Sequence, residues 1–337
     1  MVAYDMDGEP VRARQLNCVG AMVLLLKDAI DPNLVQTLEG QPVFVHGFPF
    51  ANVAHGSNSL LATRYALKLG DVVVTEGGFA TDLGAEKFFD IVCRQGGFAP
   101  DCAVIVATIR ALKMHGGACL EDVVECDSTD LEALDKGFAN LDKHIENVRL
   151  YGVPAIVAIN HFPTDTEEEI EHIRAHCERL GVRCAGSRVF SQGGQGGKEL
   201  AQAVMDVLET QSSEFRFLYD VNTPIRDKIR KIATEIYGAD DVQYVGTAAR
   251  DIRAIELAGG EHLPICMAKT QMSLSDDPRL KGAPRGWTLR VREVLLSAGA
   301  RFVVPLCGNM MLIPGLPSRP AAEHIDYTDE GRIIGLS

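Results

Sequence analysis

Apolar residues in this chain fall into short unbroken runs, with amphipathic segments between them. One such run covers residues 153–160, with the sequence VPAIVAIN, and ends at the polar Asn160. A run without polar alternation is typical of a strand buried on both faces of a parallel sheet. The loop that follows contains Phe162 and Pro163. Because ligands of such sheets bind at the carboxyl ends of the strands, this aromatic side chain is either a binding surface or a plug over the core.

The same alternation continues over most of the chain. Strands are expected in residues 42–47, 71–78, the start of 101–117, 182–190, 263–270, 287–296 and 301–308. Helices are expected in residues 16–29, 58–69, 84–94, 131–151, 166–181, 198–210 and 225–237. Thr164 or Asp165 is the expected cap of the helix over 166–181. Strands that alternate with helices at this spacing predict right-handed crossovers and a mainly parallel sheet, and therefore an α/β fold.

The composition argues against several classes of partner and of site. The 337 residues carry a net charge of −13, which argues against nucleic acid or an anionic membrane as a partner. The apolar run at residues 21–26 is too short for a signal sequence or a membrane span, so we expect a cytoplasmic protein. Nine cysteines without a CxxC pair suggest reduced structural thiols. His172 and His176 lack the glutamate of a zinc-protease motif, and no metal site is predicted.

Unusual residues concentrate in five loops that follow expected strands: HGFPFANVAHGSNS, TEGGFATDLGAEKF, TIRALKMHGG, NHFPTDT and SQGGQGG. Each loop alone has a structural explanation, because glycines after a strand often serve only the tight turn into a helix. Parallel strands would bring the five loops together, and their aromatics, amides and charges exceed what turning requires. We therefore expect a ligand site at this edge of the sheet.

Several side chains in these loops have two explanations. His46 and His55 are the imidazoles most favoured to face the site, although a histidine beside a buried strand is more often a hydrogen-bonded core residue. Arg110 and Lys113 would either hold an anion or begin a solvated helix. Asp82 would either orient a polar ligand or cap a helix, and capping is favoured.

Two aromatic residues and the absence of one motif indicate which kind of ligand the chain binds. Phe162 and Phe190 each follow an expected strand and precede a polar loop, and two such rings suit a flat heterocycle held between them. No segment has the GxxxxGK[ST] pattern of a phosphate-binding P-loop. The nearest segment, SQGGQGGKE, lacks both the hydroxyl and the first glycine. The sequence as given therefore has no cradle for the ATP triphosphate.

Eight phrases in serial order resemble the formate–tetrahydrofolate ligase family: HGFPFANVAHGSNS, TEGGFATDLGAEKFFDI, VATIRALKMHGG, GFANLDKHIENV, AINHFPTDT, ATEIYGAD, MAKTQMSLSDDP and MLIPGLP. The resemblance implies a P-loop-NTPase-like α/β fold, whose mainly parallel sheet has helices on both faces and is incomplete at the N-terminus. It also implies a second α/β domain and a small C-terminal α+β lobe. Residues 1–143 would be the rest of the nucleotide and formyl phosphate domain, residues 144–235 the folate-contacting domain, and residues 236–337 the lobe.

The resemblance also assigns site residues. It places folate-binding side chains at Phe79, Phe162, Pro163 and Phe190, and a nucleotide-binding candidate at Asn160. Phe190 stands where family members commonly have tryptophan, which keeps a stacking face but loses ring area and an indole donor. Phe48 stands where a glycine is usual, and its bulk is expected to narrow the site. The catalytic residues are expected upstream of Met1, with His46 and Arg110 as candidates within this chain.

The family joins formate to N10 of tetrahydrofolate at the expense of ATP, through formyl phosphate, and so makes 10-formyltetrahydrofolate for one-carbon metabolism. The resemblance implies formate, tetrahydrofolate and ATP as substrates, with Mg²⁺ and a monovalent cation. It implies a homotetramer, or a complex with a missing N-terminal segment that carries the P-loop. This chain would supply the folate-binding part and would be inactive alone if it truly lacks the P-loop. The alternatives are a folate-binding or assembly module without ligase activity, and a generic α/β nucleotide-dependent enzyme.

Overall fold

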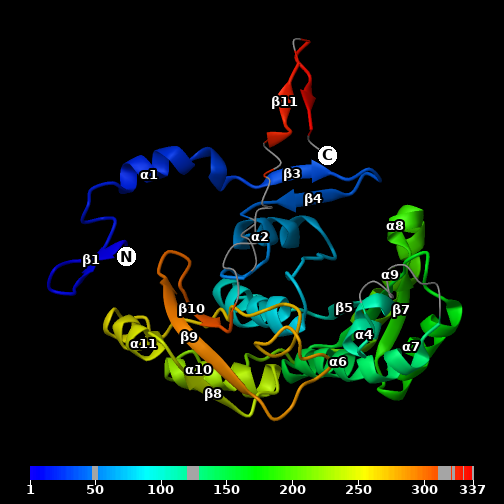
Figure 1. Cartoon of the computed structure of the whole chain (residues 1–337). Coiled ribbons are helices and arrows are strands. Elements are labelled where there is room, and N and C mark those ends of the chain that lie inside the picture. The colour runs from blue at the N-terminus through cyan, green and yellow to red at the C-terminus, as the bar shows by residue number, and fades with distance from the viewer. Residues whose placement is uncertain (48–51, 120–128, 310–319, 321–322, 329, 336–337) are drawn as a thin grey trace.

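The computed structural model describes residues 1–47, 52–119, 129–309, 320, 323–328 and 330–335 (Figure 1). Its strands are β1 (Ala3–Tyr4), β2 (Pro10–Val11), β3 (Asn33–Gln36), β4 (Pro42–Val45), β5 (Ala103–Ala107), β6 (Ala155–Asn160), β7 (Arg183–Ser187), β8 (Asp241–Tyr244), β9 (Thr288–Ser297), β10 (Phe302–Cys307), β11 (Asp326–Tyr327) and β12 (Ile333–Ile334). Its α-helices are α1 (Val19–Leu26), α2 (Leu60–Leu69), α3 (Arg94–Gly96), α4 (Ile109–His115), α6 (Leu131–Leu150), α7 (Glu167–Arg179), α8 (Val189–Gln192), α9 (Lys198–Thr210), α10 (Ile225–Lys231) and α11 (Ala248–Leu257). Shorter 3-10 segments are η1 (Asp28–Ile30) and η4 (Gly193–Gly197), and π-helical segments are η2 (Thr81–Ala85), η3 (Phe88–Cys93) and η5 (Ile232–Ile236).

A parallel sheet in the order β5-β6-β7 has the predicted strand at its centre. Ile159 of β6 lies beside Ala107 of β5 and Gly186 of β7, so the three strands end at the same edge. The apolar run over residues 153–160 is therefore a central strand, and the predicted α/β fold is confirmed. The loops after all three strands begin at one edge, as the sequence predicted for them.

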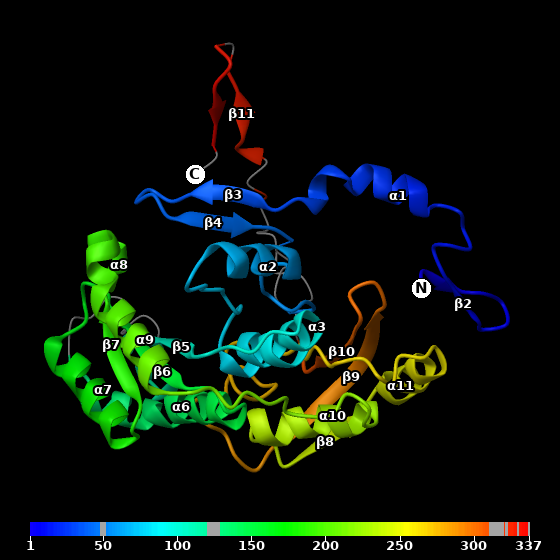
Figure 2. The same ribbon diagram turned by 180° about the vertical axis from the view of Figure 1, so that it is seen from behind.

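Helices cover both faces of this sheet, as predicted. Val157 and Ile159 point to one face and pack with apolar side chains of α6 and α7. Ile156 points to the other face and packs with Ala203 and Val207 of α9, which Figure 2 shows beside β6 and β7. Burial of each Val or Ile side chain contributes about 1.5 to 3 kcal/mol, which is why the unbroken apolar run specifies the central position.

One strand of the sheet is covered on one face only. β5 is an edge strand among the described residues, and its side chains alternate between buried Ile105 and exposed Val104 and Val106. The exposed fractions of the last two are 39% and 66%. The face of the sheet that α9 covers over β6 and β7 is thus open over β5.

A second three-stranded sheet forms the other half of the body. β9 pairs in parallel with β8 and antiparallel with β10, with a register shift at Leu306 and Cys307. Buried side chains of α10, η5 and α11, including Ile229 and Ile232, join Val291 of β9 and Val157 of β6 in one hydrophobic core. The two sheets therefore share a continuous apolar interior.

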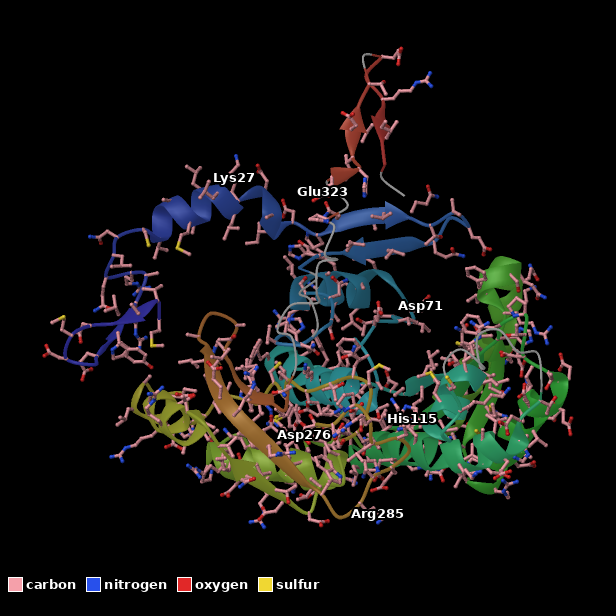
Figure 3. All side chains as sticks on the ribbon, viewed as in Figure 1. Lys27, Asp71, His115, Asp276, Arg285 and Glu323 are labelled. Carbon is pink, nitrogen blue, oxygen red and sulfur yellow. The ribbon has the colours of Figure 1, made fainter. Side chains whose placement is uncertain are left out.

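An N-terminal arm and a C-terminal hairpin extend from this body (Figure 1). The arm consists of β1, β2, α1 and the β3–β4 hairpin, and α1 has no buried residue. Lys27 on the arm and Glu323 near the hairpin lie far from His115, which sits in the body (Figure 3). No helix in the described part of the chain is long and apolar enough to span a membrane.

Three expected strands differ from the prediction. Residues 42–47 contribute β4, but β4 pairs antiparallel with β3 through a short local turn instead of joining the parallel sheet. Residues 71–78 form no strand. Residues 263–270 run beside β10 and make only isolated bridges at Ile265 and Ala268. Apolar content alone was the basis of these predictions, and it does not specify which neighbour supplies the backbone partners.

Candidate functional site

The loop after β6 is fastened by its own polar groups. Asp165 accepts a hydrogen bond of 2.8 Å from the backbone N–H of Phe162. The backbone N–H of His161 donates to the carbonyl of Ser187, 3.0 Å away, and so ties the loop to the end of β7. Phe162 is half-buried and leaves the strand in a direction that these two bonds determine.

The helix after this loop begins one residue later than expected. Its cap is Thr166, which forms a capping box with Glu169, whereas Thr164 or Asp165 was predicted. The carboxylate of Asp165 is already engaged by Phe162, which explains the shift. The acidic first turn of α7 places negative charge at the positive end of the helix dipole.

Arg110 brings the loop after β5 onto the loop after β6. Its guanidinium carbon lies 4.3 Å from the centre of the Phe162 ring, within range of a cation–π contact. A guanidinium nitrogen also donates to the Thr164 hydroxyl at 3.1 Å. Its buried Nε has no hydrogen-bond partner among the described residues. One face of the Phe162 ring is therefore occupied by a cation from α4.

Lys113, one turn further along α4, does not present its charge to solvent. It forms a buried ion pair with Glu169 of α7, and both side chains are almost fully enclosed. Burial by itself raises the pKa of Glu169, but the hydrogen bonds from Lys113 and from the backbone of Asp130 and Thr166, with the charge of Lys113, together leave that pKa below its usual value. The structure shows Lys113 neither as a free anion-binding group nor at a solvated helix start. Its ammonium instead holds α4 against α7.

Phe190 and the glycine-rich loop lie at the end of β7. The strand was expected to reach residue 190, but it ends at Ser187, and Phe190 belongs to the short helix α8. The ring is 91% exposed. Among the ring contacts of the described residues, none joins Phe190 to Phe162. The backbone N–H of Gly194 donates to the Glu39 carboxylate at 2.7 Å, so this loop offers amide donors to a carboxylate.

In the sequence, Asn160 stands two residues before Phe162, and Pro163 follows it directly. Asn160 is the last residue of β6, is half-buried and pairs in register with Ser187. Pro163 is exposed. The sheet thus places Asn160, Phe162, Pro163 and Arg110 at one edge, while their roles toward ligands stay predictions.

Phe79 has an unusual backbone conformation. Its φ is +65°, in the left-handed region that a non-glycine residue adopts at a cost of about 1 kcal/mol or more. The ring is 45% exposed, directly before the π-helical segment η2. Strain of this kind often persists at ligand sites, because surrounding contacts hold it in place.

The imidazole of His46 is held at both nitrogens. Nδ1 lies 2.8 Å from the Ser59 hydroxyl, and Nε2 lies 2.8 Å from the carbonyl oxygen of Ala29. This is the geometry of a hydrogen-bonded structural histidine. Burial, followed by the charge of Lys87, lowers the pKa of His55. Phe48 lies outside the described residues.

A column of buried carboxylates was missed by the sequence analysis. Asp82, Glu86 and Asp90 recur at four-residue spacing, face the interior and are at most 4% exposed. Asp90 accepts a hydrogen bond of 2.8 Å from the Tyr151 hydroxyl and one of 2.9 Å from Arg94. Acidic residues at this spacing ordinarily mark a solvated helix face, so the spacing alone gave no signal of burial.

Glu86, in the middle of the column, has no hydrogen-bond partner at either carboxylate oxygen among the described residues. Burial, with the neighbouring charge of Asp90, raises its pKa well above the usual value. On the facing helix α6, Asn147 is also buried, and both of its side-chain polar atoms lack a partner within the part of the chain that the structure describes. Asp82 differs, because it pairs with Lys269 and does not cap the helix as was favoured.

The described residues contain no group of three or more His, Cys, Asp or Glu side chains arranged to hold a metal ion. Each described cysteine is a free thiol. The chemistry available at the edge of the sheet is therefore that of aromatic faces, one guanidinium, amides and backbone N–H groups.

Comparison with known protein families shows the family to which the chain is similar. A family model described as formate–tetrahydrofolate ligase matches residues 1–337, the whole chain. The match includes the loops after β5, β6 and β7 that contain Arg110, Phe162 and Phe190.

Proposed function

The chain belongs to the formate–tetrahydrofolate ligase family, and on that basis we propose that it supplies the folate-binding part of an enzyme that joins formate to tetrahydrofolate with ATP. The observation that carries the proposal is the Phe162 ring, held at the carboxyl end of the central strand with Arg110 on one face. Aromatic rings bind flat heterocycles by stacking. The pterin or aminobenzoyl ring of the folate would take the other face of Phe162.

In the proposed reaction, a formate oxygen attacks the γ-phosphorus of ATP and ADP leaves, and N10 of the folate then attacks the carbonyl carbon of formyl phosphate, with loss of phosphate and of the N10 proton. Catalysis of this kind depends mainly on positioning and on neutralising charge. Phe162, Phe190, Pro163 and Phe79 would position the folate. Arg110 would contribute positive charge beside it, and Asn160 a polar contact to the nucleotide. The backbone N–H of Gly194 in the glycine-rich loop, which binds the Glu39 carboxylate, suits an acidic group of the ligand.

We propose that a polypeptide segment other than these 337 residues supplies the phosphate-handling half. The sequence has no GxxxxGK[ST] segment. The open edge and open face of β5, with Val104 and Val106 exposed, suit a further strand and helix of the same sheet. The division into residues 1–143, 144–235 and 236–337 belongs to this proposal, and limited proteolysis would test it.

Among the described residues, no three or more His, Cys, Asp or Glu side chains are grouped to hold a metal ion. Mg²⁺ usually binds through one or two carboxylates together with substrate phosphates. We therefore derive no step through a metal ion from this chain. A homotetramer is part of the proposal through the family alone, and analytical ultracentrifugation would test it.

Titration of the purified chain with tetrahydrofolate, followed by intrinsic fluorescence, tests the folate site. Phe162→Ala should raise the dissociation constant about ten- to a hundredfold, from roughly 1 to 3 kcal/mol per stacked planar ring. Phe217→Ala is the matched control, because Phe217 also stacks with a guanidinium, that of Arg94 at 3.9 Å, but lies elsewhere. An unchanged dissociation constant for Phe162→Ala would remove Phe162 from the site.

An activity assay separates the ligase from the second candidate, a folate-binding or assembly module. The motivation for that candidate is the absent P-loop pattern. The chain alone should form no 10-formyltetrahydrofolate from ATP, formate and tetrahydrofolate. Turnover by the chain alone would refute the proposal that another segment supplies the phosphate-handling half. It would also refute the hypothesis of a module without ligase activity. Turnover only after addition of a P-loop segment of the family would support the ligase.

A further inference from the structure

A buried ion pair lies next to the turn that carries Phe79. Nζ of Lys269 is 2.6 Å from a carboxylate oxygen of Asp82, and the lysine side chain is completely enclosed. The same ammonium donates to the carbonyl oxygens of Thr270 at 3.0 Å and Ser273 at 2.6 Å. These three partners use all of its donors.

The segment that carries Lys269 is itself firmly placed. It runs beside β10, where the N–H of Cys266 bonds the carbonyl of Val303 at 2.8 Å and the N–H of Ala268 bonds that of Pro305 at 3.0 Å. Lys269 also lies over the Tyr237 ring, 4.9 Å from its centre. The ion pair therefore connects the Phe79 turn to the second sheet.

Contacts on both sides hold the turn in its strained conformation, among them the bond of 2.9 Å from the N–H of Gly78 to the carbonyl oxygen of Gly56. Phe79 has φ of +65°, three residues before Asp82. The Thr81 hydroxyl lies 2.7 Å from Nδ1 of His144, which supplies a second attachment. The helix start packs directly on the turn, since a Cβ at Gly84 would lie 1.9 Å from the Gly78 carbonyl oxygen. A backbone in this region persists only when surrounding contacts determine it.

We propose that Lys269, through its ion pair with Asp82, is a positioning residue that holds the Phe79 turn in its left-handed conformation and so sets the affinity of the folate site. The inference rests on the proposed function for the effect on folate, and on the geometry for the effect on the turn. Lys269 acts through Phe79 and does not itself touch the ligand.

The charges around the pair agree with this role. Burial alone raises the pKa of Asp82, but the charges of Lys269 and His144 and the hydrogen bonds to the carboxylate together bring it below the usual value. Burial lowers the pKa of His144, and the charge of Asp82 opposes that shift. Removal of Lys269 would leave an ionised, enclosed carboxylate without its cation, and the segment at Asp82 would move toward solvent to hydrate it.

The test uses an indole at the turn as reporter. Trp287 is the only tryptophan, so Phe79→Trp in a Trp287→Phe background gives a single signal. Lys269→Met should raise the acrylamide quenching of that indole. Lys228→Met is the matched control, because Lys228 is equally enclosed and donates to the carbonyls of Val221, Glu261 and Leu263. It should leave the quenching unchanged.

Tetrahydrofolate titration of the chain with native Phe79 gives the second measurement. Lys269→Met should raise the dissociation constant about tenfold, within the range for one stacked ring. In the Phe79→Ala background the same substitution should add nothing further. Additive losses would overturn the proposal, because Lys269 would then act on another part of the site. Equal effects of Lys269→Met and Lys228→Met on quenching would overturn it as well.

If Lys269→Met does not fold, as judged by circular dichroism, Asp82→Asn replaces it, because it keeps the side-chain volume and an acceptor while removing the charge. The same directions are expected, and no change in quenching with Asp82→Asn overturns the proposal. If the parent chain does not bind tetrahydrofolate, the proposed function fails, and the indole comparison still decides whether Lys269 holds the turn.

Discussion

Lys113→Met tests the contact that joins the loops after β5 and β6. Methionine keeps most of the volume of the side chain and removes only its charge. Glu169 then loses its ion-pair partner in an enclosed position between α4 and α7. Its remaining hydrogen bonds come from the Asp130 N–H at 3.1 Å, and from the N–H and hydroxyl of Thr166 at 3.2 and 3.0 Å.

The expected loss follows from these contacts. Removal of one partner of a buried ion pair typically destabilises a protein by about 3 to 5 kcal/mol. Because Glu169 keeps three donors, we expect the lower end, about 3 kcal/mol in the free energy of unfolding. Lys136→Met is the control, since Lys136 pairs with Glu132 at 2.6 Å but the two side chains are 61% and 82% exposed. An exposed pair of this kind contributes far less, because solvent screens its charges.

Urea denaturation followed by circular dichroism measures both variants. The double variant Lys113→Met/Glu169→Gln removes both charges and should recover about half of the loss, since no uncompensated charge stays buried. The loss should also shrink as the pH falls from 7 to 5. In the variant, burial raises the pKa of Glu169 without the opposing lysine, so the carboxyl takes up a proton more readily when folded than when unfolded. A Lys113→Met variant as stable as Lys136→Met would refute this reasoning.

Three further predictions concern Phe190, the column of buried carboxylates and the edge strand β5. Phe190→Trp should lower the dissociation constant of tetrahydrofolate several-fold, about 1 kcal/mol, because it adds ring area and a donor at an exposed position; an unchanged titration would argue against Phe190 as a clamp. The stability of Glu86→Gln relative to wild type should increase as the pH rises from 5 to 8. Burial raises the pKa of Glu86 in the folded state, so above pH 4.5 the native wild-type protein binds more protons than its unfolded state and loses stability as the pH rises. Equal differences in urea stability at the two pH values would contradict this. Ile105→Ala should cost about 3 kcal/mol and Val106→Ser less than about 0.5 kcal/mol in the isolated chain, because only Ile105 is buried; similar losses on thermal denaturation would show that the two faces of β5 are equally covered.

The sequence predicted an element correctly where the local pattern of apolar residues matched the tertiary environment of that segment. Residues 153–160 form the central strand because a run with apolar side chains on both faces has only one favourable place in a parallel sheet. The helix over residues 198–210 has the bounds that its amphipathic pattern predicted. Residues 71–78 and 263–270 also contain apolar runs, but the first forms no strand and the second makes only isolated bridges to β10, because a strand requires continuous backbone pairing with a neighbour.

The candidate site was predictable only in part. Phe162 and Arg110 were placed at the edge of the sheet from the loops in which they occur, and the structure brings the two together. That the guanidinium lies over the ring was not predictable, because the two residues belong to different loops. Phe190 was expected at a strand end and lies instead on a short exposed helix. Its role with Phe162 therefore stays a prediction.

The sequence by itself determined the α/β class, the central strand and the family, since each depends on residue order or on short-range periodicity. Only the tertiary structure decided which charges are buried and with what partners. Lys113 finds Glu169, and Lys269 finds Asp82, across elements distant in the chain. Such pairs are specified by how helices and strands pack, and the enclosed charges then require each other because water is excluded from both. The left-handed turn at Phe79 is of the same kind, since its conformation depends on contacts that no local pattern records.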